Sequence, residues 1–209
     1  MTELFQAILK GDARAASAAV QSALDSGAAP VDLLQTQMVP AMDEVGRAFE
    51  CGDYFVPELL LAGRAMKAAL EPLRPLLAAG AAAPAGRIVI GTVQGDLHDI
   101  GKNIVVSMLE GAGFAVTDLG VDVSSQKFVN AVRRNRPDIL CLSALLTVTM
   151  PAMKATIGAL ATAGLRDQVR VMIGGAPVSQ SFADEIGADG YSDNAAAAVA
   201  LARRLMSNS

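Results

Sequence analysis

The chain has 209 residues, of which 52% are hydrophobic and only 4% aromatic, so it can bury a sizeable core built mainly from aliphatic side chains. Its formal net charge is −4 and it contains no basic run, which argues against a surface that binds the phosphates of nucleic acids. No apolar run reaches the ~20 residues that a membrane-spanning helix needs, and charged residues interrupt the N-terminal segment where an export signal would be apolar, so we expect a soluble, cytoplasmic protein.

The N-terminal part of the chain, residues 1–79, predicts a helical domain. An Ala-rich segment at 12–26 has apolar residues at helical spacing. The next expected helix covers 30–49 and contains Pro40, which should kink it because proline cannot donate the backbone hydrogen bond. A further helix begins near Pro57, a residue that is favoured in the first turn. Together these segments predict a four-helix bundle.

Residues 80–86 combine Gly, Ala and Pro, which is typical of a linker between domains. From 87 to 209 short apolar segments alternate with helical ones. This alternation predicts an α/β fold, a doubly wound five-stranded parallel sheet in the flavodoxin-like (Rossmann-like) order 2-1-3-4-5. The expected strands are 88–93, 114–119, 139–142, 169–173 and a weak one near 190–191.

Three loops of the predicted sheet carry the candidate site. In such a sheet, ligands bind beyond the carboxyl ends of the strands, where the strand order reverses between strands 1 and 3. The loop after strand 1 contains the single histidine of the chain, in Asp96-Leu97-His98. The loop after strand 3 runs from Ser143 to Thr147, and the loop after strand 4 contributes Gly174 and Gly175.

The Asp-x-His pair can prepare a metal ligand. Asp96 can accept the Nδ1–H of His98, which leaves Nε2 to coordinate a metal, and Ser143 can hydrogen-bond the carboxylate from across the reversal point. One protein nitrogen is too little for a bare ion, but it suffices for a metal that arrives inside a macrocycle. Gly95 and Gly101, with the later glycine pair, would let the backbone approach a bulky ligand. A loop histidine tied to a neighbouring acid for structural reasons is the alternative.

Other site types match poorly. Five residues separate Gly95 from Gly101, where a phosphate loop has four, and Asn103 stands in place of its Ser/Thr. A later Gly-x-Gly follows a helix and precedes a strand, which is the reverse of a dinucleotide-binding turn. Cys51 and Cys141 have no CxxC spacing, so we expect two buried free thiols and no Cys/His zinc site.

These motifs resemble a known family. The segment from Gly95 to Val105 resembles the core of the cobalamin-binding domain of cobalamin-dependent methionine synthase. It is even more similar to the small corrinoid proteins of methyltransferase systems for methanol, methylamines and methoxyaromatic compounds. The resemblance covers nearly the whole chain, because 38–42 and 49–59 are similar to the helical cap of this family. The family signature D-x-H-x-x-G, S-x-L and G-G is met at Asp96/His98/Gly101, Ser143/Leu145 and Gly174/Gly175.

The resemblance implies a cobalamin cofactor, as methylcobalamin or another corrinoid, with His98 as the protein ligand to cobalt and with Asp96 and Ser143 as its partners in catalysis. It implies that the nucleotide tail of the cofactor inserts between the strand loops, and that Phe49 and Val56 of the cap cover the methyl face. Ordinary bundle core is the alternative for these two, and Val56 stands where the family often has Leu. The other implied cofactor contacts are Gly95, Leu97, Asp99, Ile100, Gly101, Leu145, Thr147, Gly174 and Gly175.

The resemblance also implies a function, that of a methyl carrier cycling between Co(I) and methyl-Co(III). Such a carrier takes the methyl group from a C1 donor and passes it to a thiol or folate acceptor. It is incomplete as an enzyme without a substrate-specific methyltransferase and an acceptor methyltransferase, and a reductive activator is a further expected partner. The alternatives are a cobalamin-binding regulatory (sensor) module and the small subunit of an adenosylcobalamin mutase.

Overall fold

The computed structural model describes residues 2–73, 75–76 and 84–207. The chain divides into two compact units, one made of residues 1–85 with 107–114 and the other of residues 86–106 with 115–209. Of the linker predicted at 80–86, residues 80–83 lie outside the described residues.

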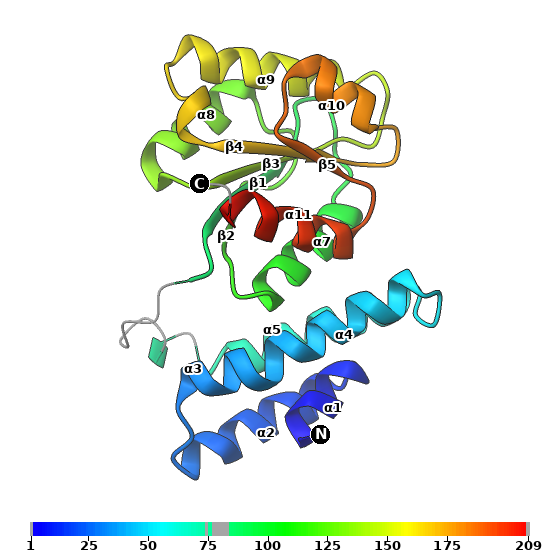
Figure 1. The fold of residues 1–209 in the computed structure, drawn as a ribbon, viewed down its shortest axis with the longest axis vertical. Coiled ribbons are helices and arrows are strands. Elements are labelled where there is room, and N and C mark those ends of the chain that lie inside the picture. Colours follow the sequence, from blue (N-terminus) through cyan, green and yellow to red (C-terminus); the bar gives the residue numbers. More distant parts are fainter. Residues whose placement is uncertain (1, 74, 77–83, 208–209) are drawn as a thin grey trace. The chain divides into compact units, whose positions relative to one another are not determined.

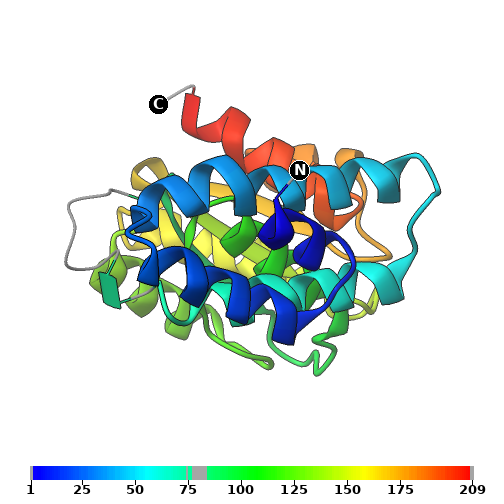
Figure 2. The ribbon, with the colours of Figure 1, turned by 90° about the horizontal axis from the view of Figure 1, so that it is seen from below.

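The first unit is helical, and its helices α1, α2, α4 and α5 lie side by side (Figure 2). The side chains of Thr2 and Asp12 begin α1 and α2, because each accepts a hydrogen bond from a backbone N–H of the first turn. The buried faces are lined by Ile8, Val20 and Met66 among others. The elements are α1 (Glu3–Leu9), α2 (Ala13–Asp25), α3 (Pro30–Leu33), the π-helix η1 (Leu34–Met38), α4 (Val39–Glu50) and α5 (Val56–Leu70).

A π-turn accommodates Pro40. Helices α3, η1 and α4 follow one another without a break, and the wide turn η1 ends one residue before Val39. Pro40 has no N–H to donate to the carbonyl of Thr36, and Val39 donates instead to Leu34, five residues back. The widened turn therefore lets the helix continue past the proline.

The two cysteines differ in environment, and the prediction that both are buried is wrong for Cys51. This residue follows α4 in a turn and is exposed. Cys141 is buried inside the sheet, and burial raises the pKa of its thiol. The prediction for Cys51 relied only on the general tendency of cysteine to be buried, because a turn has no hydrophobic periodicity that would indicate its exposure.

The second unit confirms the predicted α/β fold. Its five strands are parallel and lie in the order β2-β1-β3-β4-β5. Helices α8, α9 and α10 cover one face of the sheet, and α7 and α11 lie on the other (Figure 1). None of the described helices combines the length and apolarity needed to cross a membrane. The elements are β1 (Arg87–Thr92), α7 (Ile100–Gly111), β2 (Ala115–Asp118), α8 (Ser125–Asn135), β3 (Ile139–Ser143), α9 (Pro151–Thr162), the 3-10 helix η2 (Arg166–Gln168), β4 (Arg170–Gly174), α10 (Gln180–Ile186), β5 (Gly190–Ser192) and α11 (Ala195–Ser207).

The strand register brings the loops of the site to one edge. Thr92 of β1 pairs with Ser143 of β3, which pairs in turn with Gly174 of β4. The three strands therefore end at the same level, and the loops that follow them begin side by side. Beneath them, the ring of Phe128 packs so close to the sheet that a Cβ on Gly91 would lie 2.9 Å from it. Glycine at this position lets α8 pack tightly under β1.

Candidate functional site

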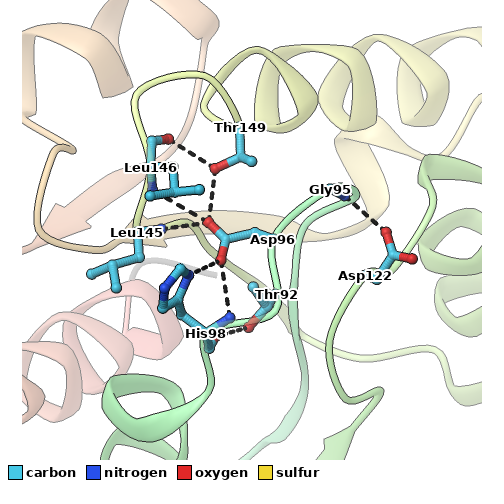
Figure 3. A network of polar contacts seen from close by, with 8 residues as sticks. All are labelled: Thr92, Gly95, Asp96, His98, Asp122, Leu145, Leu146 and Thr149. Atoms are coloured by element: carbon cyan, nitrogen blue, oxygen red, sulfur yellow. Dashed lines mark hydrogen bonds and ion pairs between the residues drawn. The ribbon is translucent and has the colours of Figure 1, made fainter.

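The loop after β1 and the loop after β3 are joined by one buried carboxylate (Figure 3). Asp96 is fully buried. Its Oδ2 accepts hydrogen bonds from the backbone N–H of Leu145 at 2.7 Å, the N–H of Leu146 at 3.3 Å and the Thr149 hydroxyl at 2.7 Å. Its Oδ1 accepts from the backbone N–H of His98 at 3.0 Å and contacts Nδ1 of the same residue at 2.7 Å. The two loops are therefore held at a set distance.

These contacts keep Asp96 ionised although it is buried. Burial by itself would raise the pKa of this carboxyl. The hydrogen bonds from the Leu145 and His98 amides, the Thr149 hydroxyl and the His98 ring outweigh burial and hold the pKa well below its usual range. The site thus contains a fixed negative charge next to an imidazole.

His98 presents one free ring nitrogen. Its side chain is 50% exposed, and its backbone carbonyl accepts a hydrogen bond from the buried Thr92 hydroxyl at 2.9 Å. Because the ionised Asp96 can only accept, the proton of a neutral imidazole is assigned to Nδ1, and the lone pair then lies on Nε2. Nε2 has no hydrogen-bond partner in the described part of the chain. The ring is therefore oriented and polarised to donate to an electrophile or a metal.

Large apolar side chains are exposed in the same two loops and at the first residue of α7. Five of them have exposed fractions between 40% and 80%. A group of exposed aliphatic side chains is uncommon on a soluble protein and marks a surface for an apolar or amphipathic ligand. They are Leu97, Ile100, Leu145, Leu146 and Val148.

The hydrogen bond predicted from Ser143 to Asp96 is absent, and Thr149 makes it instead. Ser143 is the last residue of β3, and its carbonyl accepts from the N–H of Val93. Asp96 reaches past the end of the strand, where the N–H groups of the β3–α9 loop and the Thr149 hydroxyl converge. The sequence carries no local signal for Thr149, because Met150 is the N-cap of α9 and the hydroxyl's carboxylate partner lies 53 residues away. Loop length alone did not show which hydroxyl would face the carboxylate.

We expect Thr149→Val to lower the free energy of unfolding by about 1–3 kcal/mol, because it removes a donor from a buried charge. Ser143→Ala is the matched control and should cost less than about 0.5 kcal/mol. Thr149→Ser should recover most of the loss. Urea unfolding of the three variants at neutral pH checks this, and an equal or larger cost for Ser143→Ala would contradict the assignment.

The glycine pair after β4 is required by a close backbone approach. Gly175 has φ +132°, and a Cβ there would lie 1.8 Å from the carbonyl oxygen of Ala144 in the β3–α9 loop. A Cβ on Gly174 would lie 3.0 Å from the Ser192 carbonyl. The loops after β3 and β4 are therefore in direct contact at the candidate site. Gly101 differs, because a Cβ there would meet nothing within 4 Å.

The remaining predicted residues lie in two places. Thr147 and Asp99 are exposed in the site loops, and Asp99 accepts a hydrogen bond from the Asn103 side chain at 3.1 Å. Phe49 and Val56 belong to the helical unit, where Phe49 is half-buried in the last turn of α4 and Val56 is 45% exposed at the start of α5. Val56 is therefore not part of the core of the helical bundle.

Sequence reasoning missed a buried cation beside the site loop. Lys102, in the first turn of α7, is 4% exposed, and its Nζ lies 2.5 Å from Oδ2 of Asp118 and 2.8 Å from Oδ1 of Asn103. The pair ties the start of α7 to the end of β2. Lysine is rarely buried and its partner is distant in sequence, so no local pattern indicated the pair. In the described ranges, no three His, Cys, Asp or Glu residues cluster in a way that could hold a metal ion.

Comparisons with known proteins agree across the chain. Two family models, each described as a B12 binding domain, match residues 1–74 and 86–200. The chain is 44% identical over 210 residues to dimethylamine corrinoid protein 1 of Methanosarcina acetivorans, covering 99% of this chain and 97% of that protein. It is 42% identical over 202 residues to trimethylamine corrinoid protein 1 of the same organism, covering 96% and 94%.

Solved structures give the same result. A cobalamin-binding protein from Desulfitobacterium hafniense DCB-2 matches with a TM-score of 0.79 at 37% identity, over 97% of this chain and 96% of that one. A chain of the methanol:cobalamin methyltransferase complex from Methanosarcina barkeri matches with a TM-score of 0.87 at 31% identity, over 99% of this chain and 79% of that one.

Proposed function

Because this chain belongs to the family of cobalamin-binding corrinoid proteins of methyltransferase systems, we propose that it holds cobalamin through His98 and carries a methyl group between partner proteins. The observation that carries the proposal is the Asp96–His98 pair, in which the buried carboxylate contacts Nδ1 at 2.7 Å and Nε2 stays free. When bound, the corrinoid supplies a cobalt that accepts and releases a methyl group.

The residues of the site suit this group. A single imidazole nitrogen matches a metal whose other ligands come from a macrocycle. The exposed aliphatic side chains beside it, among them Leu97, Ile100 and Leu145, suit the apolar faces of such a ring. The close contact at Gly175 packs the loops after β3 and β4 against each other at this edge of the sheet, where the family binds the polar tail of the cofactor.

Asp96 modifies the properties of His98 through its contact with Nδ1. A carboxylate on Nδ1–H raises the electron density of the imidazole and holds its orientation, so His98 can stay in place when its bond to the metal weakens. The hydrogen bonds from the β3–α9 loop and from His98 lower the pKa of that carboxyl and so favour its ionised form. His98, Asp96 and Thr149 therefore work as one positioned unit.

We further propose a methylamine as the original methyl donor. This proposal rests on the relatives named as dimethylamine and trimethylamine corrinoid proteins. The matches to them cover nearly the whole of each relative and of this chain. A substrate-specific methyltransferase would deliver the methyl group and an acceptor methyltransferase would pass it to a thiol or folate, with a reductive activator restoring the reduced cofactor. A related chain comes from a methanol:cobalamin methyltransferase complex, which supports partners of this kind.

The test separates methyl carriage from donor choice. The protein is loaded with cobalamin, reduced, and given ¹³C-labelled methyl iodide, and NMR should detect the label on the protein-bound corrinoid. Labelled mono-, di- or trimethylamine with an amine-specific methyltransferase should give the same signal. No label from methyl iodide would contradict methyl carriage, and label from methyl iodide but from no amine would contradict the donor. Light-dependent oligomerisation with adenosylcobalamin would favour a sensor instead.

A further inference from the structure

Asp122, in the loop after β2, contacts the histidine loop at Gly95 (Figure 3) and at Asp96. Its Oδ1 accepts a hydrogen bond from the backbone N–H of Gly95 at 2.8 Å. Its own backbone N–H donates to the carbonyl of Asp96 at 3.0 Å. Both peptide groups that flank the start of the Asp-x-His segment are thus held by one residue.

The backbone of Asp122 adopts an unusual conformation to make these bonds. Its φ is +50°, and Arg136 is the one other described non-glycine residue with a positive φ. Arg136 ends helix α8, where the left-handed conformation is ordinary. Asp122 ends no helix, but aspartate and asparagine tolerate this region better than other residues with side chains. A strained residue that makes two bonds to a site loop indicates a functional constraint.

The histidine loop is also held on its other side, by the β3–α9 loop. The Asp96 carboxylate binds the β3–α9 loop, and the Asp96 main chain binds Asp122 of the β2–α8 loop. In addition, the N–H of Val123 donates to the carbonyl of Thr92 at 3.0 Å. The histidine loop is therefore fastened from two directions, by the β3–α9 loop through the Asp96 carboxylate and by the β2–α8 loop through Asp122 and Val123.

We propose that Asp122 is a positioning residue, which holds the Gly95–Asp96 segment so that His98 would present Nε2 to the cobalt. The inference rests on the proposed function, because it takes His98 as the ligand. Asp122 contacts neither the ring of His98 nor its carboxylate partner through its own carboxylate. Its effect is transmitted through the backbone of Gly95 and Asp96.

Two substitutions separate the hydrogen bond from the backbone conformation. Asp122→Asn keeps an acceptor and tolerates the positive φ, whereas Asp122→Gly keeps the φ and loses the acceptor. We expect the Gly variant to melt close to the wild-type temperature but to bind cobalamin about tenfold or more weakly, with a smaller histidine-ligated fraction in its absorption spectrum. The Asn variant should behave as wild type.

The apo-protein gives a second readout that needs no cofactor. The chain has one histidine, so NMR shows one set of imidazole signals, and these should stay sharp in Asp122→Asn but shift or multiply in Asp122→Gly. Arg136→Gly is the matched control, with the same relief of a positive φ away from the site, and should leave both readouts unchanged.

Wild-type imidazole signals together with wild-type cobalamin affinity in Asp122→Gly would overturn the inference. So would an Asn variant that binds as weakly as the Gly variant. A wild-type protein without histidine ligation would refute the proposed function and this inference with it, and that outcome is recognised before any variant is made.

Discussion

Replacing His98 with alanine is expected to abolish the histidine-ligated spectrum of bound cobalamin and to weaken its binding on the order of 100-fold. His98 is the one histidine of the chain, so no other imidazole can take its place. Its side chain is half-exposed, so the loss should come from the missing metal bond and not from unfolding. Absorption spectra and cobalamin titrations of the two proteins measure both effects.

Added imidazole provides the control for this variant. A small base can enter the space left by the side chain and contact Asp96, which still has its other donors. We expect imidazole to restore a nitrogen-ligated spectrum in His98→Ala but to leave the wild type unchanged. An alanine variant that keeps the wild-type spectrum without imidazole would contradict the ligand assignment.

The second large effect is expected at Asp96. Asp96→Asn places an amide NH₂ group among five N–H and O–H donors, so at least one donor loses its partner inside the protein. We expect the free energy of unfolding to fall by about 2–4 kcal/mol at neutral pH. Cobalamin affinity should fall about tenfold to hundredfold, because the imidazole loses the carboxylate that orients it.

This stability difference should depend on pH in one direction. The folded-state pKa of Asp96 is lowered, so its contribution is fully present above the unfolded pKa of about 3.9 and is lost as the pH falls through the folded value. The stabilities of wild type and Asp96→Asn should therefore begin to converge as the pH falls below about 4 and should approach each other further as it nears the lowered folded-state pKa. Urea unfolding at several pH values measures this.

Asp99→Asn is the matched control for Asp96→Asn. It makes the same chemical change three residues further along, at an exposed carboxylate bonded to the Asn103 side chain. Its stability should change by less than about 0.5 kcal/mol. If Asp96→Asn were no more harmful than this control, the buried carboxylate would not be holding the two loops together.

The sequence predicts the fold because its signals are local and repeated. Apolar β-branched segments at regular intervals indicate parallel strands, and the strand order then locates the site loops. The π-turn before Pro40 could not be predicted, because a simple bend would also accommodate the missing N–H. The exposure of Cys51 was missed because residue type outweighed its place in a turn.

In the site, the sequence predicts the residues but not all of their contacts. Asp96 and His98 are two residues apart, so their pairing follows from local geometry and is found at 2.7 Å. The choice of Thr149 over Ser143 depends on how the β3–α9 loop folds back, and no periodic pattern records that. The roles of Asp122 and Lys102 likewise depend on segments that are distant in sequence and meet only in the folded sheet.

The bond between His98 and cobalt can be measured directly by electron paramagnetic resonance of the protein loaded with cobalamin in the Co(II) state. Growth on ¹⁵N-histidine labels a single imidazole, because the chain has one histidine. An axial ¹⁴N ligand splits each cobalt line into a triplet, and an axial ¹⁵N ligand splits it into a doublet. With His98 as the ligand, labelling should convert the triplets into doublets. Triplets that persist in the labelled protein would show that the axial nitrogen belongs to the cofactor itself, and His98 would not be the ligand.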